Sequence, residues 1–490
     1  MRTRVQTTAV RPRGRVLLAR SALGALLALG GCASPEAVRD EVRQSRSEDS
    51  RQWAATAGRG GEAEPAISGR LTLEDAVKLA LRYNKELQAA AQETDVARGR
   101  TLEAKAMALP SVTAGAQYAR LDQSPHIAFG EQSFDIAVEE NYSTRLEVRQ
   151  PLFAGGAIRS ALRSARLGSA LSDQGIREQV ERTIYAVASA YYDALLAGHL
   201  YDVNRDAVSA AEAHLDDVRK RQRQGTASNY DVLRSEVEVS GFKAEMIRQR
   251  NRIARAKTSL LKSMGVVQEQ ELELADELSY HPVPTQWQDA APRALENRPE
   301  LSEAELAIRL QEEAVRIAQS AYMPRIFATF AETEANPAPH TPTESEWGAG
   351  WMAGATAEWA LFDIGREGKT GAEKARLRQR RDQLADARER VLMEVRQALL
   401  GVQDADEFVD SQKMNLDRAS ESLRLAELGY RQGLQSQVEV TDAQVAVTRT
   451  RGLYYQAIYD HCVARLGLDR AMGLLGVKAD GTTVTMPQPR

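Results

Sequence analysis

Two long stretches of the chain place apolar residues three and four positions apart, the pattern of a helix that packs along one side. Neither residues 158–222 nor 366–431 contain a proline. About 65 residues of helix span on the order of 100 Å at 1.5 Å per residue. The second stretch predicts a coiled-coil seam with Gln412 as its one polar member: Val391, Val395, Ala398, Val402, Ala405, Val409, Gln412, Leu416, Ala419, Leu423, Ala426, Tyr430.

Shorter stretches alternate polar and apolar residues, which is typical of strands. They predict strands at about 111–122, 141–150, 325–334 and 350–360. The last stretch has tryptophan at both ends of a face of small residues, a pattern that resembles the aromatic girdles of membrane barrels. The aromatic residues expected at a membrane interface are Tyr142, Trp351 and Trp359.

The chain is a duplication. The segment LTLEDAVKLALRYNKELQAA, which begins at Leu71, is echoed by WQDAAPRALENRPELSEAEL, which begins at Trp287. Further pairs keep their order: Pro110 with Pro324, QPLFAGG with WALFDIG, and the RQG segments that end at Gly225 and Gly433. We therefore predict two repeats, 70–279 and 280–476, each with two strands and a long helical pair that turns near its glycine.

Four strands of about ten residues can cross a bilayer, but a free sheet edge in lipid would leave backbone groups without hydrogen bonds. Membrane barrels begin at about eight strands, so one chain cannot close a barrel. The pattern predicts that several chains share one. The alternative interpretation is a small soluble sheet that caps a helical protein.

Composition agrees with the helical prediction. Hydrophobic residues make up 43%, charged residues 27% and aromatic residues 6% of the 490 positions, a balance that favours long helices over an aromatic-filled α/β core. The formal net charge of -4 gives no reason to expect nucleic acid as a partner.

Residues 1–31 have the pattern of a lipoprotein signal peptide, with several arginines followed by an apolar run that ends at Gly31 and Cys32. We expect Cys32 to carry lipid and residues 32–69 to form an acylated linker; an ordinary signal peptide with an incidental cysteine is the alternative. Residues 477–490 are expected to form a flexible tail. Cys462 is the one other cysteine, so no intramolecular disulfide is expected once Cys32 is acylated.

The sequence contains one motif that resembles a phosphate-binding loop, Gly365-Arg366-Glu367-Gly368-Lys369-Thr370. Asp363 stands where that motif needs its first glycine. The six histidines have no metal-ligand spacing with cysteines, and no catalytic constellation is present. We expect no enzymatic activity, no cofactor and no metal site.

The duplicated motifs together resemble those of the TolC-like outer-membrane efflux proteins over nearly all of the mature chain. They are LTLEDAVKLALRYNKEL with ALENRPEL, QPLFAGG with ALFDIG, and RQGTASNYDVL with RQGLQSQVEV. The resemblance implies a mainly α protein with a small β part. It also implies a homotrimer with a twelve-stranded transmembrane β-barrel, four strands per chain, and a long coiled-coil α-helical periplasmic barrel.

The resemblance also implies two groups of functional residues near the helical turns. Residues at the turns would contact a periplasmic adaptor (membrane fusion) protein, which connects the channel to an inner-membrane pump. These turn residues are Gly225, Thr226, Ser228, Gly433, Leu434 and Ser436. Other residues would form the periplasmic gate: Asp231, Tyr430, Glu439, Asp442. Plain turn geometry for the glycines and a solvated helix surface for the acids are the alternatives. Gln435 stands where the family archetype has an arginine, so a charged latch at this position is in doubt.

The predicted function is an outer-membrane channel subunit of a tripartite efflux system. It would give passive export of small molecules such as drugs, metals or other toxic compounds, and it would be lipid-anchored in the outer membrane and extend into the periplasm. A type I protein-secretion channel and a non-conducting, lipid-anchored coiled-coil scaffold are the alternatives.

Overall fold

The computed structural model describes residues 35–56, 69–123, 126–129, 132–135, 137–267 and 270–476. The chain divides into two units, Met1–Pro65 and Ala66–Arg490. The described part of the first unit is a helix, α2 (Pro35–Thr56), within the predicted linker. The predicted signal peptide, Cys32 and the predicted tail lie outside the described residues.

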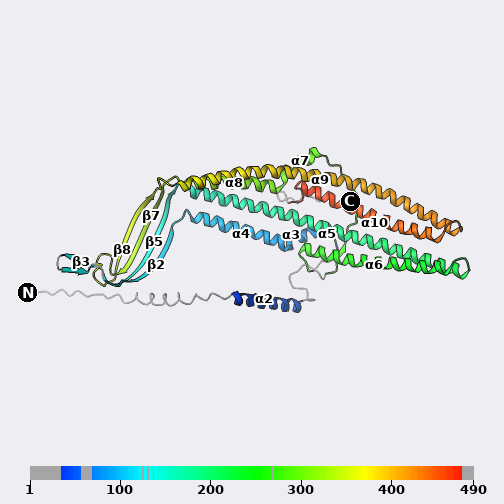
Figure 1. The fold of residues 1–490 in the computed structure, drawn as a ribbon, viewed down its shortest axis with the longest axis horizontal. Helices are drawn as coiled ribbons and strands as arrows, with labels where there is room; N and C mark the ends of the chain where they lie inside the picture. The colour runs from blue at the N-terminus through cyan, green and yellow to red at the C-terminus, as the bar shows by residue number, and fades with distance from the viewer. Residues whose placement is uncertain are drawn as a thin grey trace, which may run out of the picture. The chain divides into compact units, whose positions relative to one another are not determined.

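The second unit contains a similar succession of elements twice, and the β3–β4 hairpin of the first copy has no counterpart between the described strands of the second (Figure 1). The first copy consists of β1 (Arg70–Leu71), α3 (Leu73–Tyr83), α4 (Lys85–Ala106), β2 (Ser111–Arg120), a β3 (His126–Phe129) and β4 (Gln132–Asp135) hairpin, β5 (Glu140–Ala154), α5 (Ala157–Arg223) and α6 (Asn229–Met264). The second consists of β6 (Glu273–Leu274), α7 (Trp287–Asn297), α8 (Pro299–Ser320), β7 (Arg325–Asn336), β8 (Gly348–Glu358), α9 (Ile364–Arg431) and α10 (Gln437–Ala471). The prediction of a mainly α protein with a small β part and two structural repeats is confirmed.

The four long strands form one antiparallel sheet in the order β2-β5-β7-β8, so each repeat supplies two neighbouring strands. Among the described residues, β2 and β8 each have a partner on one side only. The strand β5 runs past the predicted end at about residue 150, because a bulge between Pro151 and Phe153 accommodates the proline, which has no N–H for the ladder.

The register of the sheet separates an apolar face from a polar face. Residues paired across antiparallel strands lie on the same face. One face is mostly apolar: Val112, Tyr118, Tyr142, Leu146, Val148, Phe330, Trp351, Ala353, Ala355. Its polar members are Thr144, Gln150, Glu332, Glu334 and Asn336. The other face is mostly polar, with Phe327, Ala331 and Met352 among its apolar members: Thr113, Gln117, Ser143, Arg145, Glu147, Arg149, Thr329, Thr333, Thr356.

The long helices form two antiparallel hairpins, α5 with α6 and α9 with α10, and Figure 1 shows the sheet beyond one end of these helices and the hairpin turns at the other. The main core lies along α5 and includes Val187, Tyr191 and Leu260, all with no exposed surface. The Tyr191 hydroxyl donates to the carbonyl of Leu71 at 2.9 Å, so α5 holds the start of the first repeat. Within the described part of the chain, no helix is both long and apolar enough to cross a membrane.

Candidate functional site

The two hairpin turns have the same backbone geometry in both repeats. Gly225 and Gly433 have φ of 78° and 75°, a region that glycine enters at low cost. The N–H of Thr226 donates to the carbonyl of Arg221, and the N–H of Leu434 donates to the carbonyl of Gly429. These are the bonds of a Schellman motif, so each glycine ends one long helix where the next must begin. Leu434 is 78% exposed at this end of the second hairpin.

The returning helices α6 and α10 both begin with a capping box. The Ser228 N–H donates to the Asp231 carboxylate at 2.9 Å, and the Ser436 N–H donates to the Glu439 carboxylate at 2.7 Å. Each serine hydroxyl accepts in return from the backbone N–H of that acid, at 3.1 and 3.4 Å. Two of the predicted gate acids therefore also stabilise the first turn of a helix.

The third predicted acid, Asp442, lies on the exposed side of α10. It faces Glu238 of α6, which accepts a hydrogen bond from the Thr441 hydroxyl at 3.0 Å. Burial raises the pKa of Glu238, the Thr441 bond opposes that shift, and the Asp442 charge adds to it. The structure thus places carboxylates from both hairpins close together beyond the capping boxes.

Tyr430, the predicted gate aromatic, is half-buried against α5. The guanidinium of Arg221 lies over its ring, 4.3 Å from the centroid, and donates from Nη1 to the Tyr430 carbonyl at 3.4 Å. The His214 ring lies 5.5 Å from the same aromatic ring, and Asp217 accepts from Arg221 Nε at 3.1 Å. Sequence reasoning missed these three α5 residues, although their spacing of three and four places them on one helix face.

Gln435 does not reach the other hairpin. Its side chain folds back over its own helix, where a Cβ at Gly429 would lie 2.7 Å from its Oε1. Its backbone N–H also approaches the Gly429 carbonyl at 3.3 Å. Gln435 therefore packs within the second hairpin.

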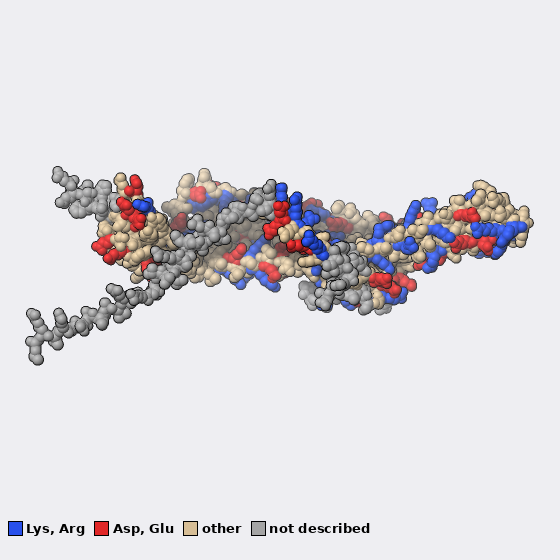
Figure 2. All heavy atoms as spheres, turned by 90° about the horizontal axis from the view of Figure 1, so that it is seen from below, with Lys and Arg blue, Asp and Glu red and all other residues tan. Residues whose placement is uncertain are grey.

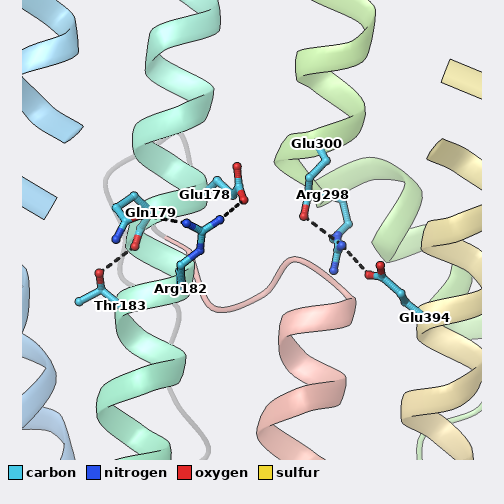
Figure 3. Close-up of polar contacts among 7 residues, drawn as sticks. All are labelled: Glu178, Gln179, Arg182, Thr183, Arg298, Glu300 and Glu394. Carbon is cyan, nitrogen blue, oxygen red and sulfur yellow. Dashed lines mark hydrogen bonds and ion pairs between the residues drawn. The ribbon is translucent and has the colours of Figure 1, made fainter. Parts of the chain in front are cut away.

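A second group of polar residues lies away from the turns, between α5, α8, α9 and α10. The buried Arg298 pairs with Glu300 at 3.0 Å and with Glu394 at 2.7 Å, and Figure 3 shows Arg298 between the two acids. A cavity of about 520 Å³ lies beside them. Burial raises the pKa of Glu181, on the adjacent face of α5, to about 7, while Arg177 opposes the shift.

The predicted interface aromatics lie at the two ends of the sheet. Tyr142 contacts Tyr118 and Trp347 with centroid distances of 4.8 and 6.3 Å, near the loops. Trp351 stacks on Phe330 at 6.4 Å towards the same end. Trp359 lies just beyond β8 at the helical end, where its indole N–H donates to the carbonyl of Tyr322 at 3.1 Å.

The segment from Gly365 to Thr370 lies inside α9 and does not form a phosphate-binding loop. Asp363 caps the helix and accepts from the N–H of Gly365 at 2.9 Å, so a carboxylate stands where a phosphate would have to bind. Over the described ranges, no three His, Cys, Asp or Glu residues are grouped so that they could hold a metal ion. Figure 2 shows basic and acidic side chains interleaved along the helical part on the face in view.

A four-stranded sheet with one apolar face, continued by two long helical hairpins in a duplicated chain, defines the class of outer-membrane channels with a helical extension. The sequence profile of the family described as "Outer membrane efflux protein" matches residues 76–266 and 290–474. The chain therefore belongs to the outer membrane efflux protein family, and the predicted resemblance to TolC-like proteins is confirmed.

Known proteins agree with this assignment. The chain is 23% identical over 380 residues to the toluene efflux pump outer membrane protein TtgC of Pseudomonas putida, covering 76% of each protein. It is 21% identical over 404 residues to the probable outer membrane lipoprotein SilC of Salmonella typhimurium, covering 80% of this chain and 84% of SilC. A crystal structure of CusC superposes with a TM-score of 0.69 at 18% identity, covering 82% of this chain and 92% of CusC.

The predicted function and location are confirmed at the level of the family: the chain is an outer-membrane efflux channel protein that extends into the periplasm. The family and the similar proteins are channel proteins rather than enzymes.

Proposed function

We propose that three copies of this chain form a channel for passive export through the outer membrane. The observation that carries this proposal is the sheet. Among the residues that the structure describes, its outer strands β2 and β8 each have a partner on one side only, and its apolar face is exposed. On that face Trp351 is 74% and Val112 is 63% exposed in a single chain. Pairing β8 of one copy with β2 of the next would satisfy the free edges, and three copies would supply twelve strands around a lumen lined by the polar face.

The turn end of the hairpins would receive the adaptor protein that links the channel to an inner-membrane pump. Gly225, Thr226, Gly433 and Leu434 are exposed there, and Ser228 and Ser436 set the direction of the returning helices. The name of TtgC, an outer membrane protein of an efflux pump, supports a role within a pump assembly. The exported compounds would be selected by the pump, because the chain supplies a passage.

The gate at this end would consist of Asp231, Tyr430, Glu439 and Asp442. Support comes from their position, since each of the four lies within three helical turns of Gly225 or Gly433. Three copies of each acid around an axis would form acidic rings, which favour cations at a narrow point.

The lipid anchor at Cys32 would add membrane affinity to that of the barrel. SilC, a probable outer membrane lipoprotein, supports this part of the proposal. If Cys32→Ala protein incorporates labelled fatty acid to the wild-type level, Cys32 is not the attachment site.

Purified full-length protein tests the central proposal. We expect a trimer by mass measurement in detergent and discrete conductance steps in a planar lipid bilayer. A stable monomer that gives no conductance would contradict the channel and would support the lipid-anchored scaffold.

A further inference from the structure

A cavity of about 520 Å³ lies where α5, α8, α9 and α10 meet, and we call it the Arg298 cavity. Small-molecule sites in proteins have volumes of roughly 300–1,000 Å³, so the cavity has the size of a ligand site. Its lining combines charged side chains, described below, with small residues of α9 and α10, which are Ala398, Gly401, Ala464, Gly467 and Ala471.

The charged groups of the Arg298 cavity form one negative and one positive site. Arg298 lies between Glu300 at 3.0 Å and Glu394 at 2.7 Å, so two carboxylates surround one cation and leave one negative charge in excess (Figure 3). The guanidinium of Arg470 lies over the ring of Tyr185, 5.1 Å from its centroid, and forms no ion pair with any acid in the described part of the chain. The cavity therefore holds separated charges of both signs that sum to zero.

Two buried polar atoms of the same cavity lack a partner. The Arg298 side chain is 9% exposed, and its Nη1 donates to the backbone carbonyl of Arg470 at 3.4 Å. Its Nε, a donor, and Oε2 of Glu300, an acceptor, are both buried without a hydrogen bond to any described residue. Buried polar groups of native proteins are nearly always hydrogen-bonded. A ligand that satisfies both atoms must offer one acceptor and one donor.

We propose that the Arg298 cavity binds a small zwitterion with one ammonium and one carboxylate, in the size range of an amino acid to a dipeptide. The ammonium donates to Glu300 and Glu394, and the carboxylate accepts from Arg470 and from Nε of Arg298. A simple anion would face the two carboxylates, and a simple cation would face Arg470. The site does not depend on the export function proposed above, because binding requires no conductance.

Calorimetric titration of the purified full-length protein in detergent tests the proposal with three peptides. Dialanine carries both charges, N-acetyl-dialanine lacks the ammonium, and dialanine amide lacks the carboxylate. We expect dialanine to bind and each derivative to bind roughly tenfold or more weakly, because each loses hydrogen bonds between charged groups. Equal affinity for the three peptides would contradict recognition of a zwitterion.

Substitution of Arg470 tests the positive site separately. Arg470→Gln should weaken dialanine binding and remove the difference between dialanine and its amide, while the preference over the acetylated peptide remains. Arg451→Gln is the matched control, because Arg451 also belongs to α10, does not line the cavity and pairs with Asp206 at 3.7 Å. A difference between dialanine and its amide that persists in Arg470→Gln would exclude Arg470 as the carboxylate partner.

A variant that fills the cavity separates a ligand from a second protein chain as its occupant. A Cβ at Gly467 would meet no atom within 4 Å, so Gly467→Leu can place its side chain there without a clash at Cβ. We expect Gly467→Leu to abolish dialanine binding and to keep the mass of the assembly. If wild type binds no dialanine, the proposal is wrong. If Gly467→Leu then also breaks the assembly, the cavity receives a neighbouring copy of the chain instead.

Discussion

Gln437, the first residue of α10, donates its side-chain amide to the backbone carbonyl of Asp231 on α6 at 3.0 Å. It also bonds to the Ser235 hydroxyl, and both Gln437 and Ser235 are buried. The hairpins are therefore joined near their turns on two sides, by Arg221 between α5 and α9, and by Gln437 and Thr441 between α6 and α10. The contacts of Arg221 and Gln437 use different helices, so each can be removed separately.

We expect Gln437→Ala to loosen the start of α6. The substitution removes a buried hydrogen-bond partner, which costs about 1–3 kcal/mol. Hydrogen exchange should become faster in residues 229–236, whereas Gln435→Ala, at an exposed position that contacts its own hairpin, should leave α6 unchanged. Equal protection of α6 in wild type and Gln437→Ala would show that the contact contributes nothing.

Neutralising the proposed gate acids should weaken block by multivalent cations. Glu439→Gln keeps a hydrogen-bond acceptor for the Ser436 N–H, so the capping box can persist while the charge is lost. We expect Glu439→Gln with Asp442→Asn to weaken block by a trivalent cation in bilayer recordings. Glu427→Gln, six positions before Gly433, is the control for loss of charge alone. Unchanged block in the double variant would remove these acids from the gate.

The buried Glu181 should make stability depend on pH. Burial raises its pKa from the ordinary 4.5 to about 7, so the folded chain favours the protonated acid. Its contribution to stability is full below about pH 4.5 and is lost as the pH rises through about 7. Glu181→Gln imitates the neutral acid at every pH.

We therefore expect Glu181→Gln to raise the free energy of unfolding by on the order of 1 kcal/mol at pH 8 and to change it little at pH 5. Thermal unfolding in detergent at both pH values measures this. Glu178→Gln is the control, because Glu178 lies on the same helix and pairs with Arg182 at 2.6 Å. If Glu181→Gln changes the stability equally at pH 5 and pH 8, ionisation of Glu181 is not the cause of the change.

The turns could be predicted from the sequence because their signals are local. Gly225 and Gly433 stand at the ends of long proline-free stretches, and the serines three residues later are favourable caps. The contact between Arg221 and Tyr430 could not be predicted, because the two residues lie in different repeats and no sequence period connects them. A basic residue in the last turn of a helix is common for local reasons, so Arg221 gave no distinctive signal.

The strands could also be predicted where the signal is local and not where it depends on pairing with another strand. Their alternation predicted all four positions in the sheet, whereas the extension of β5 to Ala154 depends on pairing with β7 at Arg325. The β3–β4 hairpin lies between two of the predicted strands, and its residues are too few to show a period. The break between α3 and α4 at Asn84 was also missed, since one capping residue inside a helical pattern is a weak signal.

Cys462 should be chemically inert in the folded protein. Burial raises the pKa of its thiol to about 12, so almost no thiolate is present at neutral pH. We expect no labelling by a maleimide reagent in the native channel and complete labelling in denaturant. A Leu434→Cys variant serves as the positive control, because position 434 is 78% exposed. Rapid native labelling of Cys462 would contradict its burial among the helices.

The duplication offers a direct test of the Arg298 network. Asn84 and Arg298 occupy equivalent positions with nearly the same backbone angles, φ -61° and ψ 122° against φ -62° and ψ 120°. Asn84 caps its helix by accepting from the N–H groups of Glu86 and Leu87 at 2.9 and 3.0 Å. Arg298 has no acceptor in its side chain and instead pairs with Glu394.

We expect Arg298→Ala to destabilise the protein by about 1–3 kcal/mol, because it removes a buried guanidinium and leaves two acids, each 38% exposed, without their partner. Arg298→Asn with Glu394→Gln should recover most of that loss, since the asparagine can cap α8 as Asn84 caps α4 and the unpaired charge on Glu394 is gone. Thermal unfolding of wild type, Arg298→Ala and the double variant shows whether a helix cap at position 298 can replace the ion pairs of the guanidinium. If the double variant is no more stable than Arg298→Ala, the contacts of the guanidinium itself hold α8, α9 and α10 together, and the cap of the first repeat cannot replace them.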